Sequence, residues 1–129
     1  MTTQRSVPFI RSSLAALLAS AVFTGSLSYA ADAFPKGSYV SGPYTLEFKG
    51  KGKFRVLKSP YPLVEGEYKV SGDQIQFTDK SGPFACSGAG QASGTYRWKL
   101  EEGNLKLSKI EDKCSDRSNS FAGPPWKRR

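Results

Sequence analysis

The chain has 129 residues, with 19 Lys and Arg against 11 Asp and Glu, two Cys and no His. This length allows one small domain, because domains usually run to roughly 100–200 residues. Without His there is no Ser-His-Asp triad, no Cys-His pair and no His-ligated metal. Composition therefore excludes several common catalytic sites and leaves a basic chain with an apolar content of 38%.

Residues 1–30 have the layout of a cleaved export signal. Two arginines precede an apolar run from Leu14 to Phe23, and small residues precede a cleavage point before Ala31. The run is too short to span a bilayer, so a signal peptide is favoured over the alternative of an N-terminal anchor helix. Removal of the signal leaves a single domain over 31–129. We expect that domain to have no membrane span and to reside in the periplasm or to be secreted.

Both cysteines, Cys86 and Cys114, lie in this domain. In an exported chain, two cysteines most simply form one disulfide. Such a bond would close a loop of about 29 residues and stabilise the fold by roughly 3–4 kcal/mol in the chain-entropy model. The alternative of a redox or nucleophilic thiol lacks both the Cys-x-x-Cys spacing and a His to activate it. The sequence therefore predicts a structural disulfide.

Apolar residues alternate with polar ones in a series of short segments, which predicts strands with one buried face. In chain order, these segments are 44–48, 54–56, 68–70, 75–77, 96–100 and 105–107. The residues between them include Gly, Asn, Asp and Pro, which are typical of turns. No window has the spacing of an amphipathic helix. The sequence predicts an all-β domain whose strands are joined mainly by hairpins.

A weak internal repeat indicates how these hairpins are arranged. Residues 66–70 and 94–98 both read Gly-x-Tyr-basic-apolar, and each leads through a tight turn into an apolar-polar-apolar strand. A Gly before an inward aromatic residue suits a strand that bends sharply as it closes a barrel. The alternative is that any two hairpins look alike at this level. The repeat favours an antiparallel meander that closes into a small β-barrel.

Three stretches do not follow the strand pattern. Residues 59–62, Ser-Pro-Tyr-Pro, predict a rigid extended loop between hairpins. Residues 85–94 are mostly small and predict a loop that the disulfide would hold in place. Residues 123–129 form either a short tail or a last segment whose Trp126 plugs the barrel.

The stretches 64–70, 94–98 and 111–117, together with the closing residues 126–128, resemble small exported bacterial lipocalin-like (calycin-type) β-barrel proteins. The similarity covers most of residues 34–129. It implies a lipocalin-like barrel. Many such proteins have no assigned activity, so the resemblance implies a fold more than a function.

Carboxylates are the remaining catalytic candidates. Acid–base catalysis needs two carboxyl groups with separated pKa values inside a cleft. Glu65 and Glu67 share one face of a predicted strand, but they alternate with apolar residues and so point to solvent. Asp79 ends another predicted strand, and the acids around Cys114 lack the spacing of a calcium-binding loop. We expect no enzyme, no metal and no cofactor, with a carboxylate-dependent hydrolase as a formal alternative.

Basic residues alternate along the predicted strands and could form a positive outer face. They are Lys49, Lys51, Lys53, Arg55, Lys69, Arg97, Lys99, Lys106 and Lys109. Proteins that bind single-stranded nucleic acids need aromatic and basic side chains on the same face. Here Phe54, Tyr96 and Trp98 alternate with the basic residues, so they lie on the opposite, inward face of the predicted strands. We therefore expect no specific nucleic-acid binding, while weak adhesion to anionic envelope polymers stays open.

These observations favour a non-catalytic binding module of lipocalin-like type. It would take a small apolar or amphipathic ligand at the barrel mouth through Tyr68, Tyr96 and Trp98. A filled interior is favoured over an open one, because a small domain needs all its apolar burial. The alternative is a periplasmic inhibitor that presents loop 59–62 or 87–94 to a hydrolase, and the positive charge favours an acidic target. The sequence carries no signal for an oligomeric state.

Overall fold

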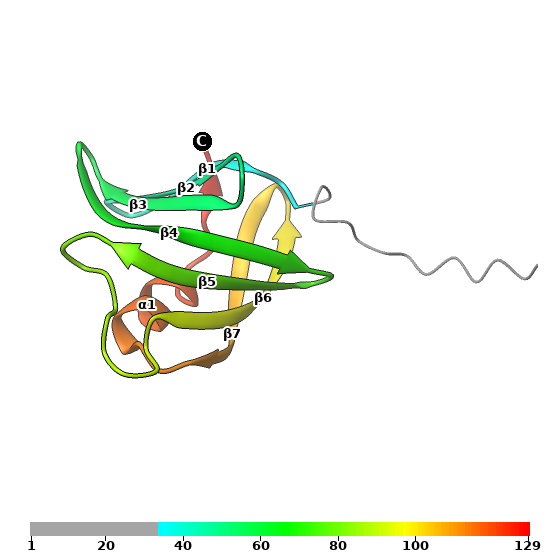
Figure 1. Ribbon diagram of the computed structural model, residues 1–129. Helices are drawn as coiled ribbons and strands as arrows, with labels where there is room; N and C mark the ends of the chain where they lie inside the picture. Colours follow the sequence, from blue (N-terminus) through cyan, green and yellow to red (C-terminus); the bar gives the residue numbers. More distant parts are fainter. Residues whose placement is uncertain (1–33) are drawn as a thin grey trace, which may run out of the picture.

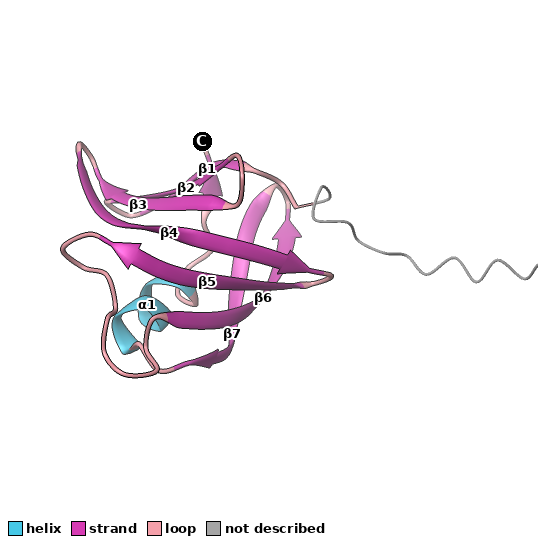
Figure 2. Ribbon diagram, in the orientation of Figure 1, coloured by secondary structure: helices cyan, strands magenta, loops and turns pink. Residues whose placement is uncertain are grey.

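The computed structural model describes residues 34–129, so the prediction of a signal peptide over 1–30 lies outside the described residues. The described chain forms a single antiparallel meander with one short helix (Figures 1 and 2). Its elements are β1 (Gly37–Ser41), β2 (Tyr44–Lys49), β3 (Lys53–Lys58), β4 (Tyr61–Ser71), β5 (Gln74–Ser81), β6 (Ser93–Glu101), β7 (Asn104–Asp112), α1 (Ser115–Phe121) and β8 (Lys127–Arg128). From β1 to β7, each strand pairs with the next along the chain. The all-β antiparallel fold predicted from the sequence is confirmed.

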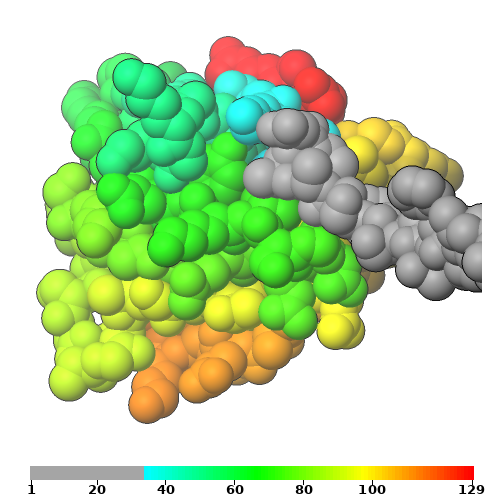
Figure 3. All heavy atoms as spheres, turned by 45° about the vertical axis from the view of Figure 1, so that its right-hand side comes forward, coloured from blue at the N-terminus to red at the C-terminus, as the bar shows by residue number. Residues whose placement is uncertain are grey.

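The C-terminal segment closes the meander into a nearly complete barrel. β8 pairs with β1, where Lys127 lies opposite Val40. Immediately before β8, Trp126 and Leu105 of β7 exchange two backbone hydrogen bonds of 2.8 Å. Figure 3 shows the red C-terminal residues against the cyan start of the described chain. The first and last strands of the meander are thus joined by a narrow seam.

Aromatic and branched side chains fill the barrel interior. The buried core consists of Phe34, Tyr39, Leu46, Phe48, Phe54, Val64, Tyr68, Ile75, Phe77, Tyr96, Leu105, Leu107, Phe121 and Trp126. The Phe77 ring lies at its centre, with its centroid 5.1 Å from that of Phe54 and 5.8 Å from that of Tyr96. Both pairs have the edge-to-face geometry that aromatic rings prefer. The interior is filled, and Trp126 is part of the plug.

Gly66 marks the bend that the sequence repeat predicts. The pairing register of β4 with β5 shifts between Glu65 and Gly66. A Cβ at this position would overlap the carbonyl oxygen of Thr78 and the ring of Phe54. A bulge increases local twist, and so it coils β4 around the barrel just before the inward Tyr68.

The sequence did not predict α1. This helix of seven residues buries Arg117, Ser118 and Phe121. Two of these three side chains are polar, so the helix has no apolar stripe that a search for helical periodicity could find. Among residues 34–129, no helix is long and apolar enough to cross a membrane.

Two predicted loops are shorter in the structure. Tyr61 and Pro62 pair with β3 and belong to β4, so the predicted loop over 59–62 is wrong and only residues 59–60 form a turn. Pro62 lies at a register shift, where a strand tolerates a residue without an N–H. At the other loop, Ser93 and Gly94 pair with β5, which moves the end of the predicted 85–94 loop to residue 92.

Because the strands alternate in direction, the connections divide between two ends of the barrel (Figure 1). One end, called here the α1 end, carries the helix, the turns at 42–43 and 59–60 and the loop 82–92. The other, called here the Phe34 end, carries Phe34 and the turns at 50–52, 72–73 and 102–103.

Candidate functional site

A cleft of about 450 Å³ opens at the α1 end, between α1 and strands β3 to β5. Its apolar wall consists of Val56, Leu63, Val64, Phe84, Phe121 and Trp126. Four charged side chains also line it, with Asp79 and Arg117 buried and Lys58 and Asp116 exposed, and Tyr44, Asn119 and Ser120 complete the lining. A mostly apolar cleft of this volume with a few placed polar groups is typical of small-molecule sites.

A second, shallower groove of about 620 Å³ runs beside the cleft, between residues 40–44 and 124–127. It shares Tyr44, Asn119, Ser120 and Trp126 with the cleft, so the two hollows adjoin. Its remaining lining comes largely from the turn after β1 and from the two prolines before Trp126. The buried charges lie only in the first cleft, which makes that cleft the chemically distinctive site.

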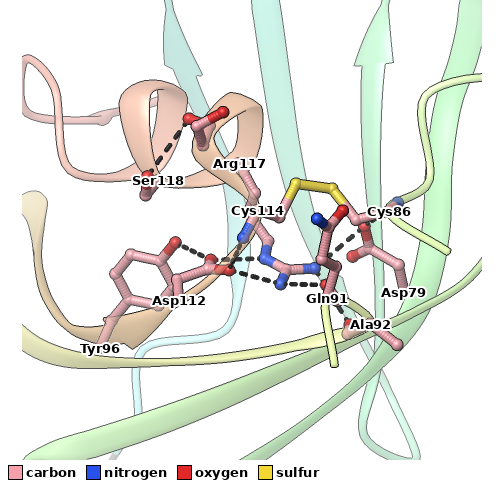
Figure 4. The surroundings of a disulfide bond; sticks show 10 residues. Asp79, Cys86, Gln91, Ala92, Tyr96, Asp112, Cys114, Arg117 and Ser118 are labelled. Atoms are coloured by element: carbon pink, nitrogen blue, oxygen red, sulfur yellow. Dashed lines mark hydrogen bonds and ion pairs between the residues drawn. A yellow bond between two sulfur atoms is a disulfide. The ribbon is translucent and has the colours of Figure 1, made fainter. Parts of the chain in front are cut away.

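Arg117 lies at the base of the cleft between two carboxylates (Figure 4). Its Nε and Nη2 donate to the two oxygens of Asp112 over 2.6 and 2.7 Å, and Nη1 lies 3.1 Å from Oδ2 of Asp79. Nη1 and Nη2 also donate to the carbonyl oxygens of Ala92 and Gln91 over 3.0 and 2.8 Å. Four N–H groups of the guanidinium therefore make hydrogen bonds within the protein, and Nη1 also forms an ion pair with Asp79.

The disulfide between Cys86 and Cys114 lies beside this cluster and confirms the predicted pairing. The backbone N–H of Cys86 donates to Oδ2 of Asp79 over 2.8 Å. The backbone N–H of Cys114 donates to Oδ1 of Asp112, also over 2.8 Å. Each bridged cysteine thus fixes one of the carboxylates that flank Arg117. The crosslink and the ionic cluster form one unit that joins loop 82–92 to the start of α1.

The hydrogen bonds set the charge states in this unit. Burial raises the pKa of Asp112, but hydrogen bonds from Arg117, the Tyr96 hydroxyl and the Cys114 N–H more than offset it, and the pKa lies below its usual value. Burial disfavours the charge on Arg117, yet Asp112 and Asp79 together raise its pKa. Burial and the neighbouring Asp112 raise the pKa of Tyr96 far above its usual value. At neutral pH, Asp112 is ionised, Arg117 is charged and Tyr96 is a neutral donor.

Asp79 has one unused oxygen. Its Oδ2 is held by Arg117 and Cys86, whereas Oδ1 has no hydrogen-bond partner among residues 34–129. The side chain is 3% exposed. Most buried polar atoms have a partner, and a missing one costs roughly 1–3 kcal/mol. The cleft therefore contains a buried acceptor that lacks a donor.

The structure places the three ligand contacts predicted from the sequence away from this cleft. Tyr68 and Tyr96 are packed in the interior, and Tyr96 reaches the cluster only through its hydroxyl, which donates to Asp112. Trp98 is half-buried at the Phe34 end, where its Nε1 donates to the carbonyl oxygen of Gly72 over 2.9 Å. None of the three lines the α1 cleft. Their contact with a ligand stays a prediction.

Of the two residues that define the cleft, sequence reasoning named Asp79 only as a carboxylate at the end of a strand, and it missed Arg117. A signal for Asp79 was present, because it continues the inward parity of Ile75 and Phe77 in β5. An acid at an inward position indicates either a buried partner or a site. Arg117 carried no such signal, since its burial depends on a helix that the pattern does not reveal.

Two other carboxylates considered from the sequence, Glu65 and Glu67, lie on the outside. Glu65 is exposed, and Glu67 pairs with Lys53 over 2.7 Å on the barrel surface. The prediction that both point to solvent is confirmed. Across residues 34–129, no three Cys, Asp or Glu side chains gather closely enough to hold a metal ion.

Comparison of the chain with protein-family models, with curated proteins and with solved structures finds no match. The strand pairing establishes a small antiparallel β-barrel, and that architecture is compatible with the binding of a ligand. The finer resemblance to lipocalin-like proteins stays a prediction.

Proposed function

We propose that this protein is an exported, non-catalytic binding module of lipocalin-like type whose α1 cleft takes a small apolar or amphipathic ligand. The observation that carries the proposal is the cleft itself, a volume of about 450 Å³ at one end of a barrel that is otherwise filled. Its walls are mainly apolar, and its buried charged groups, Asp79 and Arg117, are fixed by hydrogen bonds and ion pairs. Small-molecule sites commonly combine these two properties.

Two further features support the proposal. A disulfide fits an oxidising compartment, such as the periplasm or the extracellular space. The buried Asp112 has a lowered pKa, whereas a carboxylate acting as a general acid needs a raised one. Asp112 is thus better suited to hold Arg117 in place than to move a proton, which favours binding over hydrolysis.

The proposal is tested by filling the cleft. Ser120 is an exposed lining residue on α1, so the variant Ser120→Trp places an indole in the cleft. Ser108→Trp adds the same group to the exposed outer face of β7 and serves as the control. With the neutral fluorescent probe N-phenyl-1-naphthylamine, we expect wild-type protein and S108W to bind with similar Kd and S120W to bind at least tenfold more weakly. Equal binding by all three, or binding by none, contradicts the proposal.

A second candidate function is a protein-binding module directed at an acidic hydrolase. It is favoured by two aromatic side chains at the α1 end, Tyr61 and Phe84, which are 69% and 65% exposed. Exposed aromatic residues are frequent anchors of protein interfaces. The test is inhibition of a panel of acidic periplasmic hydrolases by wild-type protein and by the double variant Tyr61→Ser/Phe84→Ser. Inhibition that the double variant loses supports this function, and no inhibition of any enzyme contradicts it.

A further inference from the structure

We propose that the ligand of the α1 cleft carries a primary ammonium group that binds Asp79, with its apolar body against the wall formed by Val56, Leu63 and Trp126. This inference rests on the proposed function and specifies the chemistry of the ligand. It depends on three properties of the cleft: which donors are used, which acceptor is free and what charge is left over.

The cleft has no buried donor to offer to an anionic ligand. Arg117 is the buried cation, and it is held by four hydrogen bonds to Asp112 and to the carbonyl oxygens of residues 91 and 92 and by an ion pair with Asp79. A ligand carboxylate or phosphate would have to break these bonds and lie against two carboxylates. The arrangement therefore disfavours an anion at the base of the cleft.

The same arrangement leaves an acceptor free. Oδ1 of Asp79 has no partner in residues 34–129, although the side chain lines the cleft and is 3% exposed. A ligand N–H would satisfy this oxygen. A hydroxyl and an ammonium group would both make a charge-assisted hydrogen bond with the carboxylate, but only the ammonium adds the attraction between opposite charges, so it is favoured.

Charge leads to the same conclusion. Asp79, Asp112 and Arg117 have a formal charge of −1 together at neutral pH. The exposed Lys58 and Asp116 of the lining have opposite charges, so together they add no net charge to the cleft. A buried charge without a counterion is costly, and a bound monovalent cation would compensate it. The excess of basic residues in the chain lies outside this cluster. Its repulsion of a cationic ligand lowers the association rate more than the affinity.

The shape of the site favours a primary amine. Oδ1 of Asp79 has less than 1 Å² of exposed surface, so a small, sparsely substituted donor is the group that can reach it with the least movement of the cleft walls. The apolar wall then lies against the rest of the ligand, and the exposed Phe84 ring is placed to cover it near the mouth. The expected ligand is a short alkyl or arylalkyl amine.

The first experiment varies only the head group. 4-Phenylbutylamine, 4-phenylbutan-1-ol and 4-phenylbutyric acid share one apolar body and are titrated into the full domain with its disulfide intact, with amide chemical shifts as the readout. We expect the amine to bind at least tenfold more tightly than the alcohol and the acid to bind most weakly. Equal Kd values for amine and alcohol, or tightest binding of the acid, overturn the proposal.

The second experiment changes the acceptor. In Asp79→Asn, the amide oxygen can still accept from Cys86 and Arg117, while the NH₂ replaces the free oxygen with a donor. We expect the amine to lose at least tenfold in affinity and the alcohol to stay within about threefold. The control is Asp73→Asn, which removes an exposed carboxylate at the Phe34 end and should leave all three Kd values unchanged. An unchanged preference for the amine in D79N overturns the assignment to Asp79.

These outcomes separate the inference from the proposed function. If all three compounds bind equally and Ser120→Trp abolishes binding, the cleft is a ligand site and the ammonium assignment is wrong. If neither these compounds nor N-phenyl-1-naphthylamine binds, the proposed function itself is wrong. If D79N does not fold, the head-group series on the wild-type protein still decides the question.

Discussion

At the Phe34 end of the barrel, the Phe34 ring lies 4.8 Å from Phe48 and 5.1 Å from Trp98, and the three rings leave little space between them. At the α1 end, a short helix covers the opening, and a buried arginine and a disulfide hold it in place. At the Phe34 end, the closing side chains fill the available volume. At the α1 end, hydrogen bonds, ion pairs and the disulfide hold the closing residues in place without filling the space beside them, and a cleft remains.

The difference follows from the chemistry of the two closures. Aromatic rings gain free energy from every contact, so they pack until the space is used. The Arg117 cluster needs particular distances and angles, and once its hydrogen bonds are made it gains nothing by filling the space beside it. An end closed in this way combines rigidity with an open volume, which is what a binding site needs.

The largest effect is expected when the α1 closure loses its central charge. Arg117→Met leaves Asp79 and Asp112 buried without their partner, which typically costs about 3–5 kcal/mol. Arg97→Met removes an exposed pair with Asp73 and should cost less than about 1 kcal/mol. Urea unfolding of both variants measures the contrast. Similar midpoints for the two would show that the α1 end does not depend on its ionic cluster.

The next effect concerns the crosslink. Replacing both Cys86 and Cys114 by Ala removes a constraint worth roughly 3–4 kcal/mol in the chain-entropy model. Because the two cysteine amides also hold the carboxylates, amide exchange should accelerate more in residues 82–92 and α1 than at the Phe34 end. Hydrogen exchange with mass spectrometry measures this asymmetry. Uniform acceleration along the chain would contradict a local role of the disulfide.

A somewhat smaller effect is expected at the Phe34 end. Phe34→Ala should cost about 3 kcal/mol by opening a cavity beside Phe48 and Trp98, while the Kd for N-phenyl-1-naphthylamine stays within twofold. Phe84→Ala should do the reverse, with less than about 0.5 kcal/mol of lost stability and weaker probe binding. Thermal unfolding and fluorescence titration of the two variants test whether stability and binding reside at opposite ends. Loss of binding in F34A would break that separation.

The smallest effect is confined to acid. The folded-state pKa of Asp112 lies below its unfolded value of about 3.9, so its stabilisation is complete above that value and is lost as the pH falls through the folded pKa. Below about pH 4, the free energy of unfolding should therefore fall more steeply for the wild-type protein than for Asp112→Asn, by at most about 1.4 kcal/mol per pH unit. Urea titrations between pH 7 and pH 2 measure both slopes. Parallel slopes would mean that Asp112 binds its proton equally in both states.

The strands and the filled interior could be predicted from the sequence because each depends on local alternation. In β5, for example, the buried Ile75 and Phe77 alternate with the exposed Gln74 and Gln76. This alternation can be read from the sequence of β5 alone, without knowing which strands lie beside it. The cleft could not be predicted in the same way. Arg117 is buried only because Asp79 and Asp112, 38 and 5 positions away in the chain, converge on it. Such convergence is a property of the closed barrel and leaves no periodic trace in the sequence.

The seam of the barrel has a consequence for self-association. Among residues 34–129, few contacts join the ends of the meander: the Leu105–Trp126 bridge, the two pairs between β1 and β8, and a backbone hydrogen bond from Arg129 to Ser38. When this seam opens transiently, the edges of β1 and β7 are free to pair with a strand of another molecule. The exposed Lys127, Arg128 and Arg129 line the opening and repel a second copy that carries the same charges. High salt screens this repulsion, so we expect edge-to-edge assembly to increase from dilute buffer to concentrated salt.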